Sequence, residues 1–271
     1  MSADYVLETR NLIKEFKGFT AVDDVNLQVA RGHIHALIGP NGAGKTTVFN
    51  LLTKFLIPTS GQILFNGDDI TAMKPAAIAR KGVVRSFQIS AVFPHLSVLE
   101  NVRVALQRKE GHSFHFWRSQ KVLDRLNERA YELLASVGLA DFAEAQTVDL
   151  SYGRKRALEI ATTLALEPEL MLLDEPTQGM GHEDVGLVAD LIKKVSKGRT
   201  ILMVEHNLHV VSKLADRITV LQRGSILTEG DYSTVSADPR VREAYMGTAA
   251  SEEQDRADEQ AAMEVVEEAR G

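Results

Sequence analysis

The stretch Gly39-Pro40-Asn41-Gly42-Ala43-Gly44-Lys45-Thr46 decides the fold. It fits the pattern G-x-x-x-x-G-K-[ST] of a phosphate-binding loop. The apolar run His33–Ile38 before it predicts a strand, and Thr46–Leu56 after it predicts a helix. Glycines let backbone N–H groups turn around phosphate oxygens, and a helix N-terminus favours negative charge. The stretch therefore predicts a nucleoside triphosphate site, with Lys45 reaching the β- and γ-phosphates and the Thr46 hydroxyl ligating Mg²⁺.

A second run, Leu170–Leu173, is an apolar strand that ends in the acids Asp174 and Glu175. A buried parallel strand delivers its last side chains to the carboxyl edge of the sheet, where the phosphate loop also lies. Asp174 is the expected partner of Mg²⁺. Glu175 is expected to polarise a water for attack on the γ-phosphate, a general-base role that typically contributes about 10²–10⁴-fold.

Around these motifs, short β-branched runs alternate with helical patterns, which predicts an α/β fold with a mainly parallel sheet. The end pairs are expected to be antiparallel, with Arg223-Gly224 as the last turn. A helical block at about 90–166 reads as an inserted subdomain. The other predicted strands are Tyr5–Thr9, Val25–Val29, Gln62–Phe65, Val83–Ser86, Ile201–Val204, Arg217–Leu221 and Ser225–Glu229, and the helices of the block include Val98–Arg108, Trp117–Val137 and Arg154–Leu166.

Composition and charge exclude several classes. The 271 residues include no cysteine, which removes thiol catalysis, Cys-ligated zinc and iron–sulfur clusters. The formal net charge is -6. Eight acids and two bases lie in the tail 250–271, so the body is neutral, which argues against a protein that wraps nucleic acid.

No apolar run could span a bilayer and no signal peptide is evident, so we expect a cytoplasmic chain. The tail fits either a short amphipathic helix or a solvated end.

A third motif, Leu150-Ser151-Tyr152-Gly153-Arg154, opens an amphipathic helix and resembles the signature motif of ABC-type ATPases, whose common form is Leu-Ser-Gly-Gly-Gln. Ser151 is expected to cap the helix, and Gly153 to permit a close approach. Three further positions follow the order of the family. Gln88 resembles the glutamine that senses Mg²⁺ and the attacking water, His206 the histidine that contacts the γ-phosphate, and Phe16 the aromatic that stacks on adenine.

This resemblance covers residues 5–249 and implies a P-loop NTPase of ABC type, with an antiparallel β subdomain and an inserted helical subdomain. The catalytic residues implied are Glu175, His206 and Gln88, and the metal site is formed by Thr46, Gln88 and Asp174. The implied ATP-binding residues are Phe16, Gly39, Pro40, Asn41, Gly42, Ala43, Gly44, Lys45, Thr46, Thr47, Ser151, Tyr152 and Gly153.

Within the family, the sequence looks most like the ATP-binding subunits of branched-chain amino acid importers. The Leu-Ser-Tyr-Gly form, the pair Gly179-Met180, the run Val204–Asn207 and the ending Val241–Gly247 carry this likeness. It implies that the chain hydrolyses MgATP at two composite sites of a dimer. The implied partners are a membrane permease and, indirectly, an extracytoplasmic solute-binding protein. The implied location is the cytoplasmic face of the membrane. Importers of urea, short amides or other amino acids share these signals. A soluble ABC ATPase without a transport role is a further alternative.

Two positions depart from the pattern of the family. Arg154-Lys155 replaces the usual glutamine of the signature, which could favour the phosphate or merely face solvent. Gly181 stands where the D-loop usually has Asp or Asn, which puts the coupling between the two ATP sites in doubt. The segment Ile89–Leu99 is a candidate for part of the groove that docks the permease, with plain loop packing as the alternative.

Overall fold

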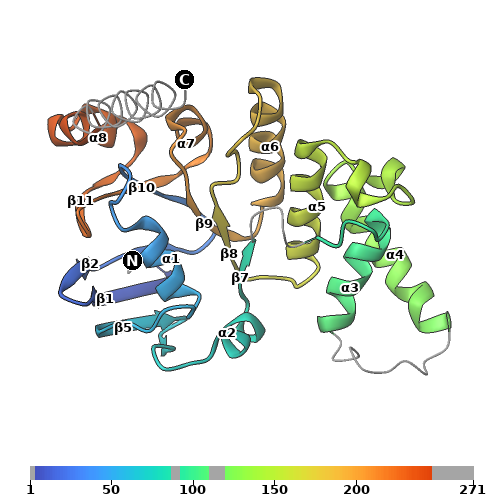
Figure 1. The fold of residues 1–271 in the computed structure, drawn as a ribbon, viewed down its shortest axis with the longest axis horizontal. Coiled ribbons are helices and arrows are strands. Elements are labelled where there is room, and N and C mark those ends of the chain that lie inside the picture. The colour runs from blue at the N-terminus through green and yellow to red at the C-terminus, as the bar shows by residue number, and fades with distance from the viewer. Residues whose placement is uncertain (1–3, 87–91, 110–119, 246–271) are drawn as a thin grey trace, which may run out of the picture.

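The computed structural model describes residues 4–86, 92–109 and 120–245. Within them, a six-stranded sheet has the order β11-β10-β4-β9-β8-β7, and all its strands are parallel except β11. A second, antiparallel sheet has the order β2-β1-β5-β6, with β3 also paired to β1. Figure 1 shows the antiparallel sheet at one end and α3 and α4 at the other. The predicted α/β class with a mainly parallel sheet is therefore confirmed.

The strands of the six-stranded sheet are β4 (Ile34–Ile38), β7 (Val83–Ser86), β8 (Leu170–Asp174), β9 (Thr200–Val204), β10 (Arg217–Gln222) and β11 (Ser225–Gly230). Those of the antiparallel sheet are β1 (Tyr5–Phe16), β2 (Phe19–Val25), β3 (Gln28–Ala30), β5 (Ser60–Phe65) and β6 (Asp68–Asp69). The helices are α1 (Lys45–Leu52), α2 (Pro75–Lys81), α3 (Val98–Lys109), α4 (Gln120–Ser136), α5 (Tyr152–Leu164), α6 (His182–Val195), α7 (Leu208–Leu214) and α8 (Tyr232–Ala237), with 3₁₀ turns at Ala140–Phe142 and Thr147–Asp149.

The six-stranded sheet is buried on both faces, because β4, β8 and β9 are continuous apolar runs. Alternate side chains of β4 enter two different cores. Ile34, Ala36 and Ile38 pack with helices α3 to α7, whereas Leu37 packs with α1 and the antiparallel sheet. Helices α1 and α5 thus lie on opposite faces of the same sheet, and Figure 1 shows β7 and β8 between them.

The single strand predicted at Val25–Val29 is wrong, since this segment is divided between β2 and β3. Both parts pair with β1, and the hydroxyl of Thr9 bridges the break. It donates to the carbonyl oxygen of Val25 at 2.8 Å and accepts from the amide of Leu27 at 2.8 Å. A buried threonine therefore takes over the hydrogen bonds that a continuous ladder would have made.

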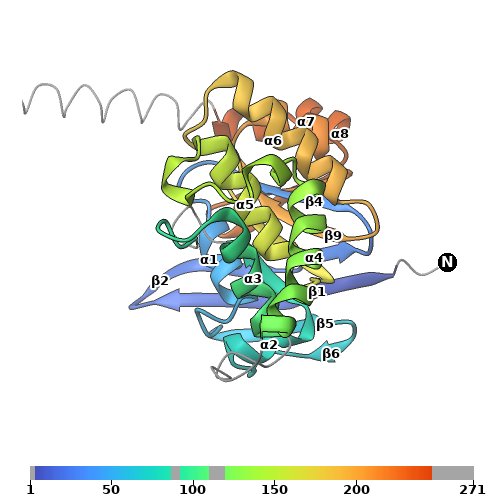
Figure 2. The ribbon, with the colours of Figure 1, turned by 90° about the vertical axis from the view of Figure 1, so that its right-hand side faces the viewer.

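Other element boundaries differ from the sequence prediction. The first strand continues from Tyr5 to Phe16 rather than ending at Thr9, and two register shifts interrupt its pairing with β2. Helix α1 ends at Leu52 rather than Leu56, because Lys54 takes a left-handed φ of 62°. In Figure 2 helices α3 to α5 gather on one side of the molecule. Within the described residues, no helix is long and apolar enough to cross a membrane.

Candidate functional site

The predicted phosphate loop connects β4 to α1 by a turn that only glycine can make without strain. Gly39 and Gly44 have φ of 149° and 99°, and a Cβ on Gly44 would lie 2.5 Å from the carbonyl oxygen of Ala21. The ammonium of Lys45 turns back over the loop and donates to the carbonyl oxygens of Gly39 at 2.6 Å and Pro40 at 2.9 Å. Burial lowers the pKa of Lys45, and the charge of Glu175 offsets part of this shift. The loop therefore has the glycine turns, the helix N-terminus and the ammonium group that anion binding requires.

Glu175 lies directly after β8 in a strained backbone conformation, with φ of 44°. Its amide donates to the carbonyl oxygen of Val204 at 2.9 Å, which joins it to the end of the neighbouring strand. Its carboxylate lies 4.0 Å from Nδ1 of His206. Because β4, β9 and β8 are neighbouring parallel strands, the loop lysine after β4, the predicted base after β8 and the predicted histidine after β9 lie at the same edge of the sheet. Backbone strain of this kind concentrates at functional sites.

Asp174 ends β8 with its side chain largely buried, and its carboxylate forms an ion pair with Arg85 at the matching end of β7. A buried carboxylate that accepts a guanidinium shows that this place accommodates positive charge, so the donor chemistry fits the expected Mg²⁺. Thr46, the second of the three expected ligands, has an exposed position in the first turn of α1. The third, Gln88, lies outside the described residues.

Glu205 organises the segments around the site, a role that sequence reasoning missed. It is fully buried between β9 and His206. One carboxylate oxygen accepts from the amide and the hydroxyl of Thr177, and the other accepts from the amides of His206 and Asn207 at 2.9 and 3.0 Å. Glu205 therefore fixes both the segment that follows Glu175 and the loop that carries His206. The run Val204–Asn207 was recognised as a family feature, but nothing in its pattern assigned this role.

Phe16 is half exposed at the end of β1 and pairs with Phe19 across the hairpin. Phe19 is the more exposed of the two and lies two residues before Ala21, whose carbonyl oxygen faces Gly44 of the phosphate loop. Two residues of strand span about 7 Å. The hairpin thus presents two aromatic rings close to the loop, of which the sequence analysis named only Phe16.

The signature segment opens α5 on the other face of the sheet. Ser151 occupies the N-cap position, but its side chain makes no capping hydrogen bond, so the expected cap is wrong. Ser151 is an exposed residue, and the first amides of α5 have no partner within the helix itself. The Tyr152 hydroxyl donates to the carbonyl oxygen of Gln178 at 3.0 Å, which joins the signature to the segment after Glu175.

The unusual cations of the signature contact residues that lie shortly before them in the chain. The guanidinium of Arg154 lies over the ring of Phe142, 4.0 Å from its centroid, and Lys155 donates to the carbonyl oxygen of Val148 at 2.9 Å. Gly181 is the N-cap residue of α6 and makes no side-chain cap. A D-loop aspartate at this position could have capped α6, which the glycine cannot do.

A buried ion pair lies between the signature helix and the end of β8, and no sequence motif pointed to it. Arg156 and Glu159 are one turn apart on α5, with almost no exposed surface. Arg156 also donates to the carbonyl oxygens of Pro176 at 3.1 Å and Asp174 at 3.0 Å. Burial raises the pKa of Glu159, and Arg156 offsets part of that shift. This arginine fastens the signature helix to the strand end that carries the predicted metal and base residues.

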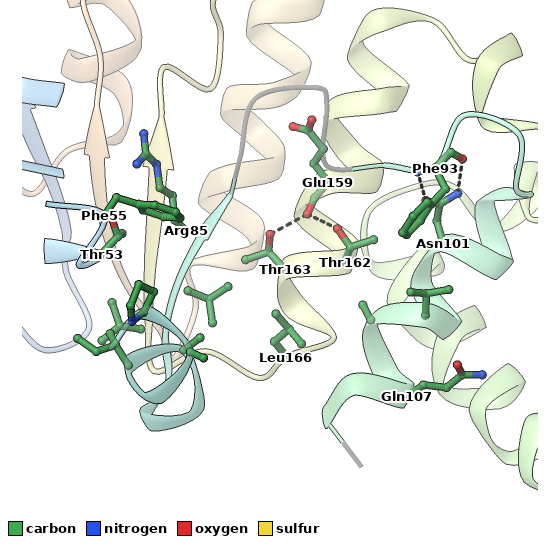
Figure 3. A pocket seen from close by; sticks show the side chains of 18 residues that line it. Thr53, Phe55, Arg85, Phe93, Asn101, Gln107, Glu159, Thr162, Thr163 and Leu166 are labelled. Carbon is green, nitrogen blue, oxygen red and sulfur yellow. Dashed lines mark hydrogen bonds between the residues drawn. The ribbon is translucent and has the colours of Figure 1, made fainter. Parts of the chain in front are cut away.

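A groove of about 710 Å³ lies between α2 and β7 on one side and α3 and α5 on the other. Figure 3 shows Phe55 and Arg85 at one end and Phe93 and Asn101 at the other. The rings of Phe55 and Phe93 are more than half exposed. Asn101 positions the Phe93 loop by accepting from its amide at 2.7 Å and donating to its carbonyl oxygen at 3.1 Å. Of the segment Ile89–Leu99, the first three residues lie outside the described residues, and Phe93 lines the groove.

Comparisons with known proteins agree with this geometry. The family model described as "ABC transporter" matches residues 22–178, and that described as "Branched-chain amino acid ATP-binding cassette transporter" matches 225–251. The chain is 37% identical over 251 residues to the "High-affinity branched-chain amino acid transport ATP-binding protein" BraF of Pseudomonas aeruginosa and to LivG of Escherichia coli K12, in each case over 90% of this chain and 98% of the relative.

Solved structures show the same fold. The ADP conformation of MJ1267, "an ATP-binding cassette of an ABC transporter", is 29% identical and superposes with a TM-score of 0.79, over 90% of this chain and 99% of that one. The cassette MJ0796, described as dimeric and bound to ADP and phosphate, is 25% identical with a TM-score of 0.70 over 83% of this chain and 98% of that one. With its phosphate loop, carboxylate pair and signature in place, the chain belongs to the ATP-binding proteins of ABC transporters, a family of ATPases.

Proposed function

We propose that this chain is the ATP-hydrolysing subunit of an ABC import system that takes up amino acids, branched-chain ones first. The observation that carries the proposal is the convergence of Lys45, Glu175 and His206 at one edge of the sheet. The names of BraF and LivG, which match almost end to end, supply the transported class. The match of residues 225–251 to the branched-chain model supports the same subgroup.

In the proposed site, the loop Gly39–Thr47 binds the phosphates of ATP and the Phe16 hairpin contacts the adenine. Thr46, Asp174 and Gln88 hold Mg²⁺, which would neutralise charge on the phosphates. Glu175 takes the proton of the attacking water, and His206 contacts the γ-phosphate. The short separation of Glu175 and His206 supports these roles, since one bound phosphate could touch both.

Hydrolysis is proposed to require two chains. The phosphate loop and the segment Ser151–Gly153 lie on opposite faces of the sheet, so one chain does not bring them together around one ATP. The exposed residue Ser151 at the start of α5 is proposed to contact a second copy or a homologous subunit. The dimeric state described for MJ0796 supports such an arrangement.

The permease is proposed to dock in the groove between α2 and α3, placing the subunit peripherally at the cytoplasmic face of the membrane. The exposed rings of Phe55 and Phe93 suit an apolar side chain from a cytoplasmic permease segment. An extracytoplasmic solute-binding protein would act only through the permease. The ATPase domain is taken as residues 1–249, with the helical block at about 90–166 inserted in it and the acidic tail 250–271 appended.

Glu175→Gln tests the catalytic part of the proposal. The amide keeps the size of the side chain and cannot accept a proton, so ATP binding should persist while turnover falls by about 10²–10⁴-fold. Turnover near the normal rate would show that another group is the base. Glu183→Gln, an acid in the first turn of α6 with no proposed role, is the matched control.

The transport part is tested by purifying the chain with its permease and measuring uptake into vesicles. Leucine, isoleucine and valine should be taken up in an ATP-dependent way, and uptake by the Glu175→Gln complex should fall by the same factor as its turnover. Uptake of urea or short amides in their place would assign the chain to a related importer. An ATPase that associates with no permease would favour a role outside transport.

A further inference from the structure

Arg85 occupies a place that no motif assigned to it. Its side chain is largely buried at the end of β7, where three elements meet. One terminal nitrogen pairs with the carboxylate of Asp174 at the end of β8. The other donates to Oδ1 of Asn50 on α1 at 2.7 Å, and the guanidinium lies 5.9 Å from the centroid of the Phe49 ring. A single planar group therefore bridges the strand of the carboxylate pair and the helix of the phosphate loop.

The position of Asn50 relates this bridge to Thr46, one of the proposed Mg²⁺ ligands. Asn50 follows Thr46 by four residues on α1, so the two side chains lie on the same face, about 6 Å apart along the axis. Arg85 thus reaches α1 one turn below one proposed Mg²⁺ ligand while it holds the carboxylate of the other. The rigid fork of a guanidinium can make two such bonds in fixed directions, which a lysine ammonium on a flexible stem cannot reproduce.

Arg85 also lines the groove between α2 and α3, beside Phe55. In Figure 3 it marks the end of the groove nearest β8, while Glu159 and Thr163 line the wall formed by α5. A segment bound in the groove would contact the same side chain that holds Asp174. The groove and the metal ligands are therefore joined through one residue rather than through a chain of contacts.

We propose that Arg85 is a positioning residue that fixes Asp174 relative to Thr46 for Mg²⁺, and that it is the contact through which a permease segment in the groove acts on this metal site. The proposal rests on the function proposed above, in which Asp174 and Thr46 hold the metal. Partners that orient metal ligands in this way typically change metal affinity by about 10–100-fold when they are replaced.

The test measures binding of a fluorescent ATP analogue as Mg²⁺ is added, in the Glu175→Gln background, where turnover does not interfere. Arg85→Lys keeps the charge but breaks the bridge, so the Mg²⁺ midpoint should rise by about tenfold. Affinity in EDTA should stay unchanged. Asn50→Ala removes only the α1 end of the bridge and introduces a good helix former, so it should fold and shift the midpoint less, in the same direction.

Two further variants distinguish an error in the metal assignment from an error in the role of Arg85. Arg31→Lys is the matched control, because Arg31 bridges Asp4, Asn66 and Glu169 at the opposite edge of the sheet, and its midpoint should equal that of the parent. Asp174→Asn should lose the gain in affinity that Mg²⁺ produces. If it keeps that gain, the metal assignment in the proposed function is wrong. If it loses the gain while Arg85→Lys and Asn50→Ala match the parent, the positioning role of Arg85 is wrong.

The groove half of the proposal is tested in the assembled transporter. The Mg²⁺ midpoint of the parent should differ between the free subunit and the complex with the permease, and Arg85→Lys should remove that difference while the complex still forms. An equal difference in the variant complex would overturn the link between the groove and the metal site.

Discussion

The phosphate loop and the signature segment each carry a glycine at the start of a helix, but the structure holds the two segments by different means. The loop is fixed by its backbone, with three glycines at positive φ and the Lys45 ammonium bound to loop carbonyls. The signature has no positive φ at Gly153 and is held by side chains, notably Tyr152 and Arg154. The loop is thus shaped by its own backbone, whereas the signature has an exposed helix start that is held by side chains.

Arg156 joins the signature helix to the end of β8, which carries Asp174 and Glu175, and Arg156→Met should produce the largest effect. Removal of one member of a buried ion pair typically costs about 3–5 kcal/mol, because the other charge is left without a partner. The backbone carbonyls of Asp174, the last residue of β8, and of Pro176 would also lose a donor. The free energy of unfolding, measured in urea at neutral pH, should fall by that amount. A loss below about 1 kcal/mol would show that the pair contributes little.

The same variant should show a distinct pH dependence. Burial already raises the pKa of Glu159 above its ordinary 4.5, and removal of Arg156 would raise it further. A group with a raised folded-state pKa contributes its full stability below the unfolded pKa and loses it as the pH rises through the folded pKa. The penalty of Arg156→Met should therefore be smaller near pH 4.5 than at neutral pH. In the double variant with Glu159→Leu, this dependence should disappear.

The two motif glycines provide the next test of the comparison. Gly44→Ala forces a side chain into a left-handed φ and against the carbonyl oxygen of Ala21, and strained backbone costs about 1–3 kcal/mol. The affinity for ATP should fall by about 10–100-fold. The Cβ of Gly153→Ala would meet only the side chain of Asp184, with Oδ1 at 2.9 Å and Cγ at 3.2 Å, and this side chain can move aside. The variant should leave ATP affinity unchanged and lower turnover alone.

Equal effects of the two alanine variants on ATP affinity would remove the distinction between a site complete in one chain and a surface offered to a second. Equilibrium binding at a protein concentration too low for dimers is the decisive measurement. Thermal unfolding of both variants serves as the control, since Gly153→Ala gains about 1 kcal/mol of helix propensity, which offsets the contact with Asp184.

These contrasts also explain how much the sequence revealed. The phosphate loop and the strand before Asp174 could be predicted because their conformation follows from local residue types: glycine for positive φ, and continuous apolar runs for a doubly buried strand. The division of Val25–Val29 into two strands could not be predicted, because it depends on the distant hydroxyl of Thr9.

The side chains that hold the site together could not be predicted either, because they also depend on distant contacts. Arg85 and Arg156 look like ordinary charged residues in a strand and a helix, and only the fold shows that both end at β8. The carboxylate of Glu205 likewise finds its partners at Thr177, far away in the sequence. Sequence patterns predicted residues for the nucleotide site, but not the residues that hold them in place, because positioning depends on contacts between elements distant in the chain.

Tyr152→Phe should have the smallest effect and the most specific one. The substitution keeps the ring, which lies against Gly179, and removes only the hydroxyl that donates to the carbonyl oxygen of Gln178. A hydrogen bond of this type contributes about 0.5–1.5 kcal/mol, and the partly exposed hydroxyl belongs at the lower end of that range. Unfolding in urea should therefore change little, and ATP affinity not at all.

The informative measurement is the turnover of the assembled dimer as ATP is varied. If Tyr152 keeps the signature in register with the segment after Glu175, loss of the bond should lower kcat with KM unchanged. Tyr131→Phe, which removes a hydroxyl bonded to Glu144 on the surface of the helical block, should leave both constants unaltered. A rise in KM for Tyr152→Phe would instead place this hydroxyl in ground-state binding of ATP, and the signature would then resemble the phosphate loop more closely than its geometry indicates.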